Sequence, residues 1–221
     1  GVDTHGAFLC TISRSILRAM GKFAALIVLG LSASAAAAGE ITSIYSDLDL
    51  KACEALELDS DEDNGEGGIW QCKGIPGFDV LYLEGDLRGF IAFGPEARSQ
   101  CTSAQTFGAF NSPGPRIEWR MENGKPIATI LRWFTENGSG EEYAKQNWLV
   151  VSKLNGRDAC RTALIDTKYP EANTVARAKA DGPARRFNCE KDMPEVVSQR
   201  AITAGELMSD VPCPGGPYRE E

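Results

Sequence analysis

The stretch RIEWRMENGKPIATILRWF, residues 116–134, carries a clear hairpin signal. Apolar and polar residues alternate on both sides of Asn123-Gly124, and an Asn-Gly pair fits the two-residue hairpin turn that needs positive φ at both positions. The stretch therefore predicts two long antiparallel strands. Pro126 lacks the N–H that a strand ladder uses, so it predicts an edge position or a bulge near the start of the second strand.

Further turns extend this hairpin into a sheet. Downstream, Asn155-Gly156 repeats the signal within residues 147–166. Upstream, the alternating segments 78–84 and 88–93 flank a reversal at Gly85-Asp86, which predicts an antiparallel meander that begins near Trp70. The preceding residues, 41–56, fit a short strand or an extended arm.

After Asp166 the apolar residues recur at the spacing of an α-helix. Pro170 suits a first helical position, and Gly182-Pro183 ends the pattern. Between them lies a stripe of small apolar residues: Ala172, Val175, Ala176 and Ala180. A second helix is predicted from Asp192, where Glu195 completes a capping box three residues later.

These elements predict an α+β fold in which β-structure dominates. We expect a twisted antiparallel sheet of hairpins, braced by disulfides. Its apolar faces would be covered by one or two C-terminal helices or by a second layer of strands.

The N-terminal residues predict a secretory signal peptide. Arg14, Arg18 and Lys22 precede the apolar run 23–31, and small residues follow up to Ala38. A basic head, a short apolar run and an A-x-A ending define such a leader, and the run is shorter than a bilayer span. Cleavage is expected before Gly39 or before Glu40.

Cleavage would leave residues 39–221 as a single globular domain in the periplasm or outside the cell, with no membrane span. The Pro- and Gly-rich residues 212–217 predict a flexible C-terminal tail that only Cys213 holds. Residues 1–38 contain three of the 23 bases and one of the 31 acids, so the mature chain has a net charge of −10.

The mature cysteines predict disulfides. They are even in number, widely spaced and free of C-x-x-C pairs, which favours bridges over metal ligation in an exported chain. The sequence does not choose among the pairings, although Cys53–Cys72 and Cys160–Cys189 are favoured. The full set is Cys53, Cys72, Cys101, Cys160, Cys189 and Cys213.

Charge and composition exclude several classes of function. An acidic body repels phosphate backbones and anionic membranes, and it attracts a cationic protein. The only histidine is His5, in the leader, so the mature chain lacks the imidazole of Ser-His-Asp, Cys-His and ordinary zinc sites. No glycine-rich nucleotide motif is present. We therefore predict no catalytic residue, no metal site and no cofactor.

Two carboxylate patterns leave alternatives open. The acidic loop DSDEDNGEGG, residues 59–68, fails the EF-hand register because Asn64 and Trp70 occupy the Gly and Glu positions, but a weak calcium-binding structural module stays an alternative. The acid pairs of a glycan hydrolase are the other alternative. The candidates for it are Asp47 with Asp49, and Glu84 with Asp86 beside Arg88.

Four segments carry a family resemblance: SIYSDLDLKAC (43–53), WQCKG (70–74), YLEGDLRGFIAFG (82–94) and ATILRW (128–133). They resemble small exported bacterial proteins of uncharacterised function, over most of the mature chain. The resemblance implies a bacterial envelope setting and no particular activity.

Together these features predict an exported, non-enzymatic binding protein with a cationic protein partner. A concrete version is an inhibitor or scavenger of a protein such as lysozyme, by analogy with other small acidic periplasmic proteins. Its oligomeric state does not follow from the sequence.

Overall fold

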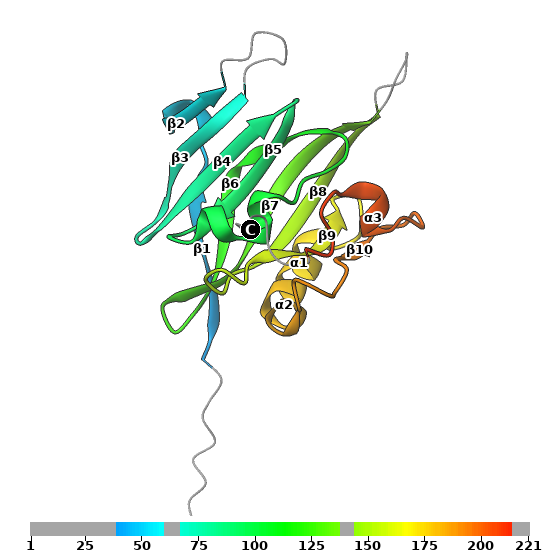
Figure 1. The fold of residues 1–221 in the computed structure, drawn as a ribbon. Helices are drawn as coiled ribbons and strands as arrows, with labels where there is room; N and C mark the ends of the chain where they lie inside the picture. The colour runs from blue at the N-terminus through cyan, green and yellow to red at the C-terminus, as the bar shows by residue number, and fades with distance from the viewer. Residues whose placement is uncertain (1–38, 60–66, 138–143, 214–221) are drawn as a thin grey trace, which may run out of the picture. The chain divides into compact units, whose positions relative to one another are not determined.

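The computed structural model of the chain describes residues 39–59, 67–137 and 144–213 (Figure 1). The predicted signal peptide with its end at Ala38, segment 60–66 of the acidic loop and the tail from Pro214 lie outside the described residues. By internal contacts the chain divides into residues 1–37 and 38–221, and the description below concerns the second unit.

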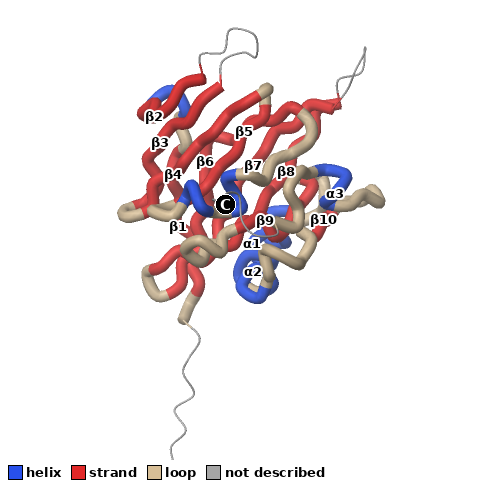
Figure 2. The backbone as a smooth tube through the Cα atoms, in the orientation of Figure 1, coloured by secondary structure: helices blue, strands red, loops and turns tan. Residues whose placement is uncertain are grey.

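The described strands form one twisted, open sheet (Figures 1 and 2). Its order is β10-β9-β8-β7-β6-β5-β4-β3-β2, and β1 pairs with β6 outside this path. The strands are β1 (Ile41–Asp47), β2 (Glu54–Asp59), β3 (Gly67–Ile75), β4 (Phe78–Gly85), β5 (Arg88–Phe93), β6 (Phe110–Glu122), β7 (Lys125–Asn137), β8 (Ala144–Lys153), β9 (Cys160–Asp166) and β10 (Glu195–Val197). The predicted β-dominant α+β fold is confirmed.

The predicted hairpin of β6 and β7 lies in the interior of the sheet. The chain turns at Asn123 and Gly124, whose φ values are 50° and 75°. The pairing register shifts opposite Pro126, between Arg120 and Met121. Because both strands have neighbours on each side, the proline is accommodated by the predicted bulge and not by an edge position.

Two pairings make the sheet mixed instead of purely antiparallel. β5 meets β6 in parallel, with Arg88 opposite Asn111, and β10 runs parallel to β9. The remaining neighbours are antiparallel, including the predicted meander β3-β4-β5 and the pair β8-β9 on either side of Asn155-Gly156.

β10 replaces the helix predicted from Asp192, so that prediction is wrong. Pro194 lacks a backbone N–H, and Val196 and Val197 are β-branched, so pairing with β9 outweighs the local capping pattern. The Asp192 carboxylate accepts a 2.8 Å hydrogen bond from the backbone N–H of Asn188 instead.

The first predicted helix is confirmed. α1 (Ala172–Asp181) buries Ala172, Ala176 and Ala180, which lie four residues apart and share one face. α2 (Pro183–Arg186) begins with its proline, and α3 (Ala204–Leu207) has a capping box of Thr203 and Glu206. Short 3₁₀ turns complete the set: η1 (Leu50–Ala52), η2 (Ala97–Ser99) and η3 (Cys101–Ser103).

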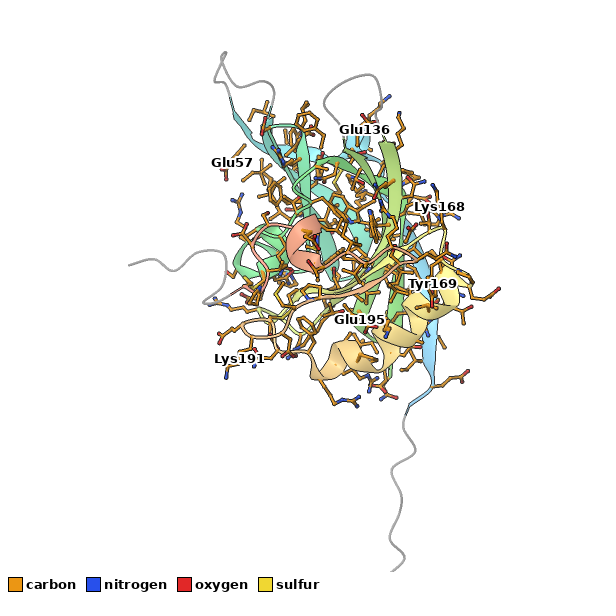
Figure 3. All side chains as sticks on the ribbon, turned by 90° about the vertical axis from the view of Figure 1, so that its right-hand side faces the viewer. Glu57, Glu136, Lys168, Tyr169, Lys191 and Glu195 are labelled. Atoms are coloured by element: carbon orange, nitrogen blue, oxygen red, sulfur yellow. A yellow bond between two sulfur atoms is a disulfide. The ribbon has the colours of Figure 1, made fainter. Side chains whose placement is uncertain are left out.

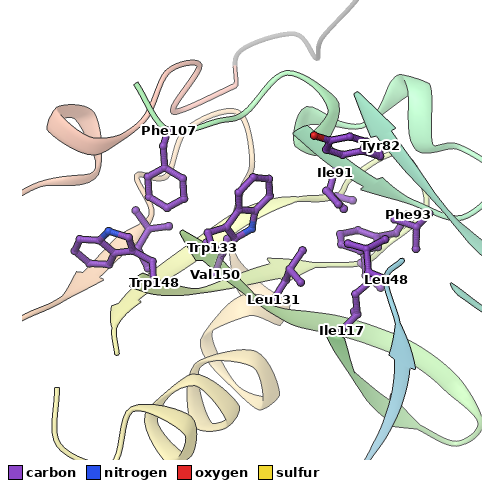
Figure 4. Packing of buried hydrophobic residues seen from close by; sticks show 14 of the residues in the cluster. Leu48, Tyr82, Ile91, Phe93, Phe107, Ile117, Leu131, Trp133, Trp148 and Val150 are labelled. Atoms are coloured by element: carbon purple, nitrogen blue, oxygen red, sulfur yellow. The ribbon is translucent and has the colours of Figure 1, made fainter. Parts of the chain in front are cut away.

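Apolar side chains pack on both faces of the sheet. On the face that we call inner, β3–β5 pack against β1 and β6, and Phe93 meets Trp119 edge-on at 5.5 Å between ring centroids. Figure 4 shows this inner core, with Phe107, Trp133 and Trp148 grouped at its other end. On the outer face, the alanines of α1 cover β7–β9. Trp119, Trp133 and Trp148 are at most 1% exposed and belong to this core.

A ladder of three ion pairs fixes α1 and α2 on β6. The strand residues are two apart and the helical residues four apart, so both sets repeat at a similar spacing. Each pair has an N–O distance of 2.7 Å: Arg177 with Glu118, Arg120 with Asp181, and Arg185 with Glu122. The charges alternate along both elements. A slip of the helix by one turn would therefore place like charges opposite each other.

All six cysteines of the described residues form disulfides. The two favoured pairs, Cys53–Cys72 and Cys160–Cys189, are present. The third bridge, Cys101–Cys213, joins residues 112 apart in the sequence. Three disulfides are consistent with a protein that matures outside the reducing cytosol.

Candidate functional site

The acids proposed for hydrolysis near the N-terminus serve local structure. Asp47 ends β1 and forms an exposed ion pair with Arg116 at 3.3 Å. Asp49 caps η1, where its carboxylate accepts a hydrogen bond from the Lys51 backbone N–H at 3.1 Å. Because Asp49 follows the strand, the two acids do not share the face of one strand as the hydrolase alternative assumed.

The second proposed pair lies at the β4–β5 turn. The Glu84 carboxylate accepts a 2.6 Å hydrogen bond from the Tyr82 hydroxyl, and burial together with this carboxylate raises the pKa of Tyr82. Asp86 pairs with Arg88, whose guanidinium also lies 5.4 Å from the Phe110 ring centroid. The carboxylates are thus engaged by neighbours within the same hairpin or the adjoining strand.

The described ranges contain no group of three or more His, Cys, Asp or Glu residues that could hold a metal ion. Residues 60–66, the centre of the acidic loop, lie outside them. The calcium alternative therefore stays a prediction.

The outer face of β2–β5 carries two hollows. The first has a volume of about 630 Å³. Its floor is a row of directly opposite residues across the four strands: Glu57, Ile69, Leu83 and Phe90. Leu58 and Glu84 also line it, and Ser103 with Ala104 closes one side. The first hollow thus has a mainly apolar floor with one carboxylate, that of Glu57, at one end.

The second hollow, of about 400 Å³, follows the next row of the same face. Gln71 and Leu81, which lie opposite each other on β3 and β4, form its floor together with Leu56. Arg98 lines this hollow and donates a 2.8 Å hydrogen bond to Glu57, which lines the first. This exposed ion pair therefore marks the boundary between the two hollows.

Both hollows adjoin β2, which forms one edge of the sheet. β2 pairs with β3 along one side only and is the last strand in the order. Its leucines are strongly exposed, Leu56 by 41% and Leu58 by 67%. Figure 3 shows Glu57 of this strand on the side of the sheet away from Lys168 and Tyr169. We call β2 and the two hollows the edge site.

The sequence contained a signal for the edge site that the prediction missed. In Glu54-Ala-Leu-Glu-Leu-Asp59 acids and leucines alternate, the pattern of a strand with one polar and one apolar face. Local alternation does not tell whether a strand lies inside the sheet or at its edge. The structure shows that β2 is an edge and that its leucines are exposed.

Among the described helices, none has the length and apolar content needed to cross a bilayer. Neither the protein-family models nor the curated proteins nor the solved structures contain a match to this chain.

Proposed function

We propose that this protein is an exported, non-enzymatic binding protein of the bacterial envelope, and that its edge site holds an extended, cationic segment of a partner protein. One observation carries the proposal: an exposed sheet edge with two exposed leucines adjoins a mainly apolar hollow that Glu57 borders. Such an edge can accept a further strand, with backbone hydrogen bonds for affinity and hollows for alternate side chains.

The edge carries only one of the features that usually block strand addition. Natural edge strands are protected by Lys, Pro, bulges or short length. β2 has six residues, contains neither Lys nor Pro, and has one register shift near Ala55. Segments with alternating apolar residues are therefore the expected ligands, because their side chains would reach one hollow at every second position.

Charge selects the type of partner. β2 carries Glu54 and Glu57, and the segment directly after it adds four acids and no base: Asp61, Glu62, Asp63 and Glu66. Two copies of this edge would bring like charges together, which disfavours a second copy as the partner. A basic segment would gain from the same charges, and its association would weaken as salt rises.

The three disulfides support a periplasmic or secreted location, because such bridges persist in oxidising compartments. In this setting lysozyme is a concrete cationic partner. An inhibitor must reduce lysozyme activity when it is present in excess. Full lysozyme activity at saturating concentrations of this protein would exclude the inhibitor version and leave the general proposal open to the next test.

Synthetic octapeptides test the proposal directly. We expect an alternating Lys-Val peptide to bind with a Kd that rises with salt, and an alternating Glu-Val peptide to bind at least tenfold more weakly. N-methylation at alternate residues, which removes backbone donors, should abolish binding of the Lys-Val peptide. Equal affinities for the two charge types, or no effect of N-methylation, would refute binding by strand addition to an acidic edge.

Leu58→Arg provides the matching change in the protein. It places a cation at the first hollow and should lower the affinity for the Lys-Val peptide at least tenfold. Leu87→Arg is the control, because Leu87 is also strongly exposed, at 61%, but does not line either hollow. If both variants bind the peptide as the wild type does, the edge site is not where the peptide binds.

A further inference from the structure

Arg161 is a charged residue that the fold buries almost completely. It lies near the start of β9 with 1% of its surface exposed, and its backbone N–H donates a 2.7 Å hydrogen bond to Gln105 Oε1. Its guanidinium lies 4.4 Å from the ring centroid of Trp133 and 5.5 Å from that of Phe107. The cation is thus held among aromatic rings of the inner core, whose grouping Figure 4 shows.

Most of the hydrogen-bonding capacity of this guanidinium is unused. Both Nη atoms of Arg161 are buried and have no hydrogen-bond partner in the described part of the chain, and the same is true of Trp148 Nε1. The buried Arg120 differs, because its Nε and Nη2 donate to the two oxygens of Asp181 at 2.7 Å each. The same fold therefore pairs one buried arginine with a carboxylate and leaves the other unpaired.

The chemistry of the unpaired donors determines which kind of ligand could accept their hydrogen bonds. A guanidinium and an indole N–H are donors only. Aromatic faces attract a cation but supply no lone pair in the plane of the guanidinium. Burial lowers the pKa of Arg161 to about 9, since nothing nearby offsets the loss of water. A carboxylate brings the missing negative charge and two acceptor oxygens in the planar geometry that a guanidinium prefers.

We propose that Arg161 anchors an internal binding site for a small carboxylic acid whose apolar part packs against Phe107, Trp133 and Trp148. This site is separate from the edge site and does not depend on the proposed function. The carboxylate would accept hydrogen bonds from the two Nη atoms.

A cover of two short segments closes this part of the core. It consists of residues 106–109 and 207–210, which pair at Phe107 and Met208. Two backbone hydrogen bonds of 3.0 Å join them, from Gly108 to Leu207 and from Ser209 to Thr106. The neighbouring α3 is a single turn of four residues. Side chains also hold these segments, since Asn111 Nδ2 donates to the Phe107 carbonyl and Gln105 Nε2 to the Asp210 carbonyl, at 3.2 Å each. A small molecule reaches the guanidinium only when these bonds open.

A carboxylate could come from a free acid or from an acidic side chain of a polypeptide. The tail 214–221 contains Glu220 and Glu221, and it follows Cys213, which is bonded to Cys101 beside the cover. We commit to the free acid. A chain that ends at Cys213 separates the two sources, because removal of the tail should leave binding of a free acid unchanged.

The test uses the full chain and a series of monocarboxylates: acetate, hexanoate and benzoate. At least one should raise the unfolding temperature saturably, by about 3 °C at ten times its Kd. Benzamide, which has the ring of benzoate without the charge, should have no effect. Arg161→Met should remove the response, and Arg161→Lys should weaken it tenfold or more. The surface control Arg200→Met should respond as the wild type does.

The variants are informative only if they fold, which circular dichroism and the fluorescence of the buried tryptophans report. If no carboxylate shifts the unfolding temperature of the full chain, the proposal is wrong. It is equally wrong if folded Arg161→Met responds like the wild type. Binding that appears only after removal of residues 214–221 would show that the tail supplies the carboxylate, which also overturns the free-acid site.

Discussion

Glu118 on β6 accepts two hydrogen bonds from the guanidinium of Arg177 on α1, at 2.7 and 3.2 Å. Burial alone would raise the pKa of Glu118. Hydrogen bonds from Arg177 and Ser43, with the charges of Arg177 and Arg120, outweigh burial and hold the pKa below its usual value. The Glu118 carboxylate thus joins three elements: α1, β6 and β1.

Glu118→Gln should lower the free energy of unfolding at pH 7 by about 2 kcal/mol. The amide leaves Arg177 and Arg120 without their shared charge, although the partial exposure of Arg177 moderates the loss. Urea unfolding measures the difference. The control Glu190→Gln, at an exposed position, should change the stability by less than about 0.5 kcal/mol.

The same pair predicts a dependence on pH. Since the folded state lowers the pKa of Glu118, the unfolded state binds this proton more readily, and the stabilisation is present above the unfolded pKa of about 4.3. It is lost as the pH falls through the lower, folded value. The difference between wild type and Glu118→Gln should therefore shrink in acid. A constant difference between pH 7 and pH 3 would contradict the assignment.

Arg161→Met should stabilise the ligand-free protein. Replacing a buried, unpaired ion by an apolar side chain of similar length is expected to raise the free energy of unfolding by about 1–4 kcal/mol. The pKa of Arg161 is about 9 in the folded state, below its unfolded value. Between the two pKa values the unfolded state binds more protons than the folded state, so the wild type gains stability as the pH rises. The difference in the free energy of unfolding between the variant and the wild type should therefore narrow above about pH 9. A destabilised variant would show that Arg161 is paired in the ligand-free protein.

The disulfides should differ in their contribution to stability. Cys101–Cys213 closes a far longer loop than Cys53–Cys72, with sequence separations of 112 and 19. Loop entropy predicts losses of about 5 and about 3 kcal/mol when each pair is replaced by alanines. Urea unfolding of the two double variants under oxidising conditions gives the order, and a reversed order would contradict the loop argument.

Leu58→Arg should separate binding from stability. Leu58 is 67% exposed, so the substitution should change the free energy of unfolding by no more than about 0.5 kcal/mol. Affinity for a Lys-Val peptide should nevertheless fall at least tenfold. A large loss of stability would mean that Leu58 supports the fold and is not reserved for a partner.

Much of the fold could be predicted from local sequence because its main determinants are local. Asn123-Gly124 selects a hairpin turn, and alternation on either side assigns residues to the two faces. The alanine spacing of residues 172–180 gives α1 for the same reason. The capping pattern at Asp192 failed because its competitor, pairing of residues 195–197 with β9, is a contact between distant parts of the chain.

The candidate sites could not be located from the local signals alone, because both depend on such distant contacts. In the sequence, Leu56 and Leu58 belong to an ordinary alternating strand, and only the strand order makes β2 an edge. In the sequence, Arg161 looks like an ordinary polar residue of a strand. Its burial follows from Phe107, which another segment places over the same face.

Hydrogen exchange at the edge strand tests the central proposal most directly. With the Lys-Val peptide bound, backbone amides of β2 should exchange more slowly, while those of β10, at the opposite edge, should exchange at their free rate. Measurement by mass spectrometry at low salt, with the N-methylated peptide as control, distinguishes strand addition from diffuse attraction. Unchanged exchange in β2 at saturating peptide would contradict the account, whatever affinity the peptide shows.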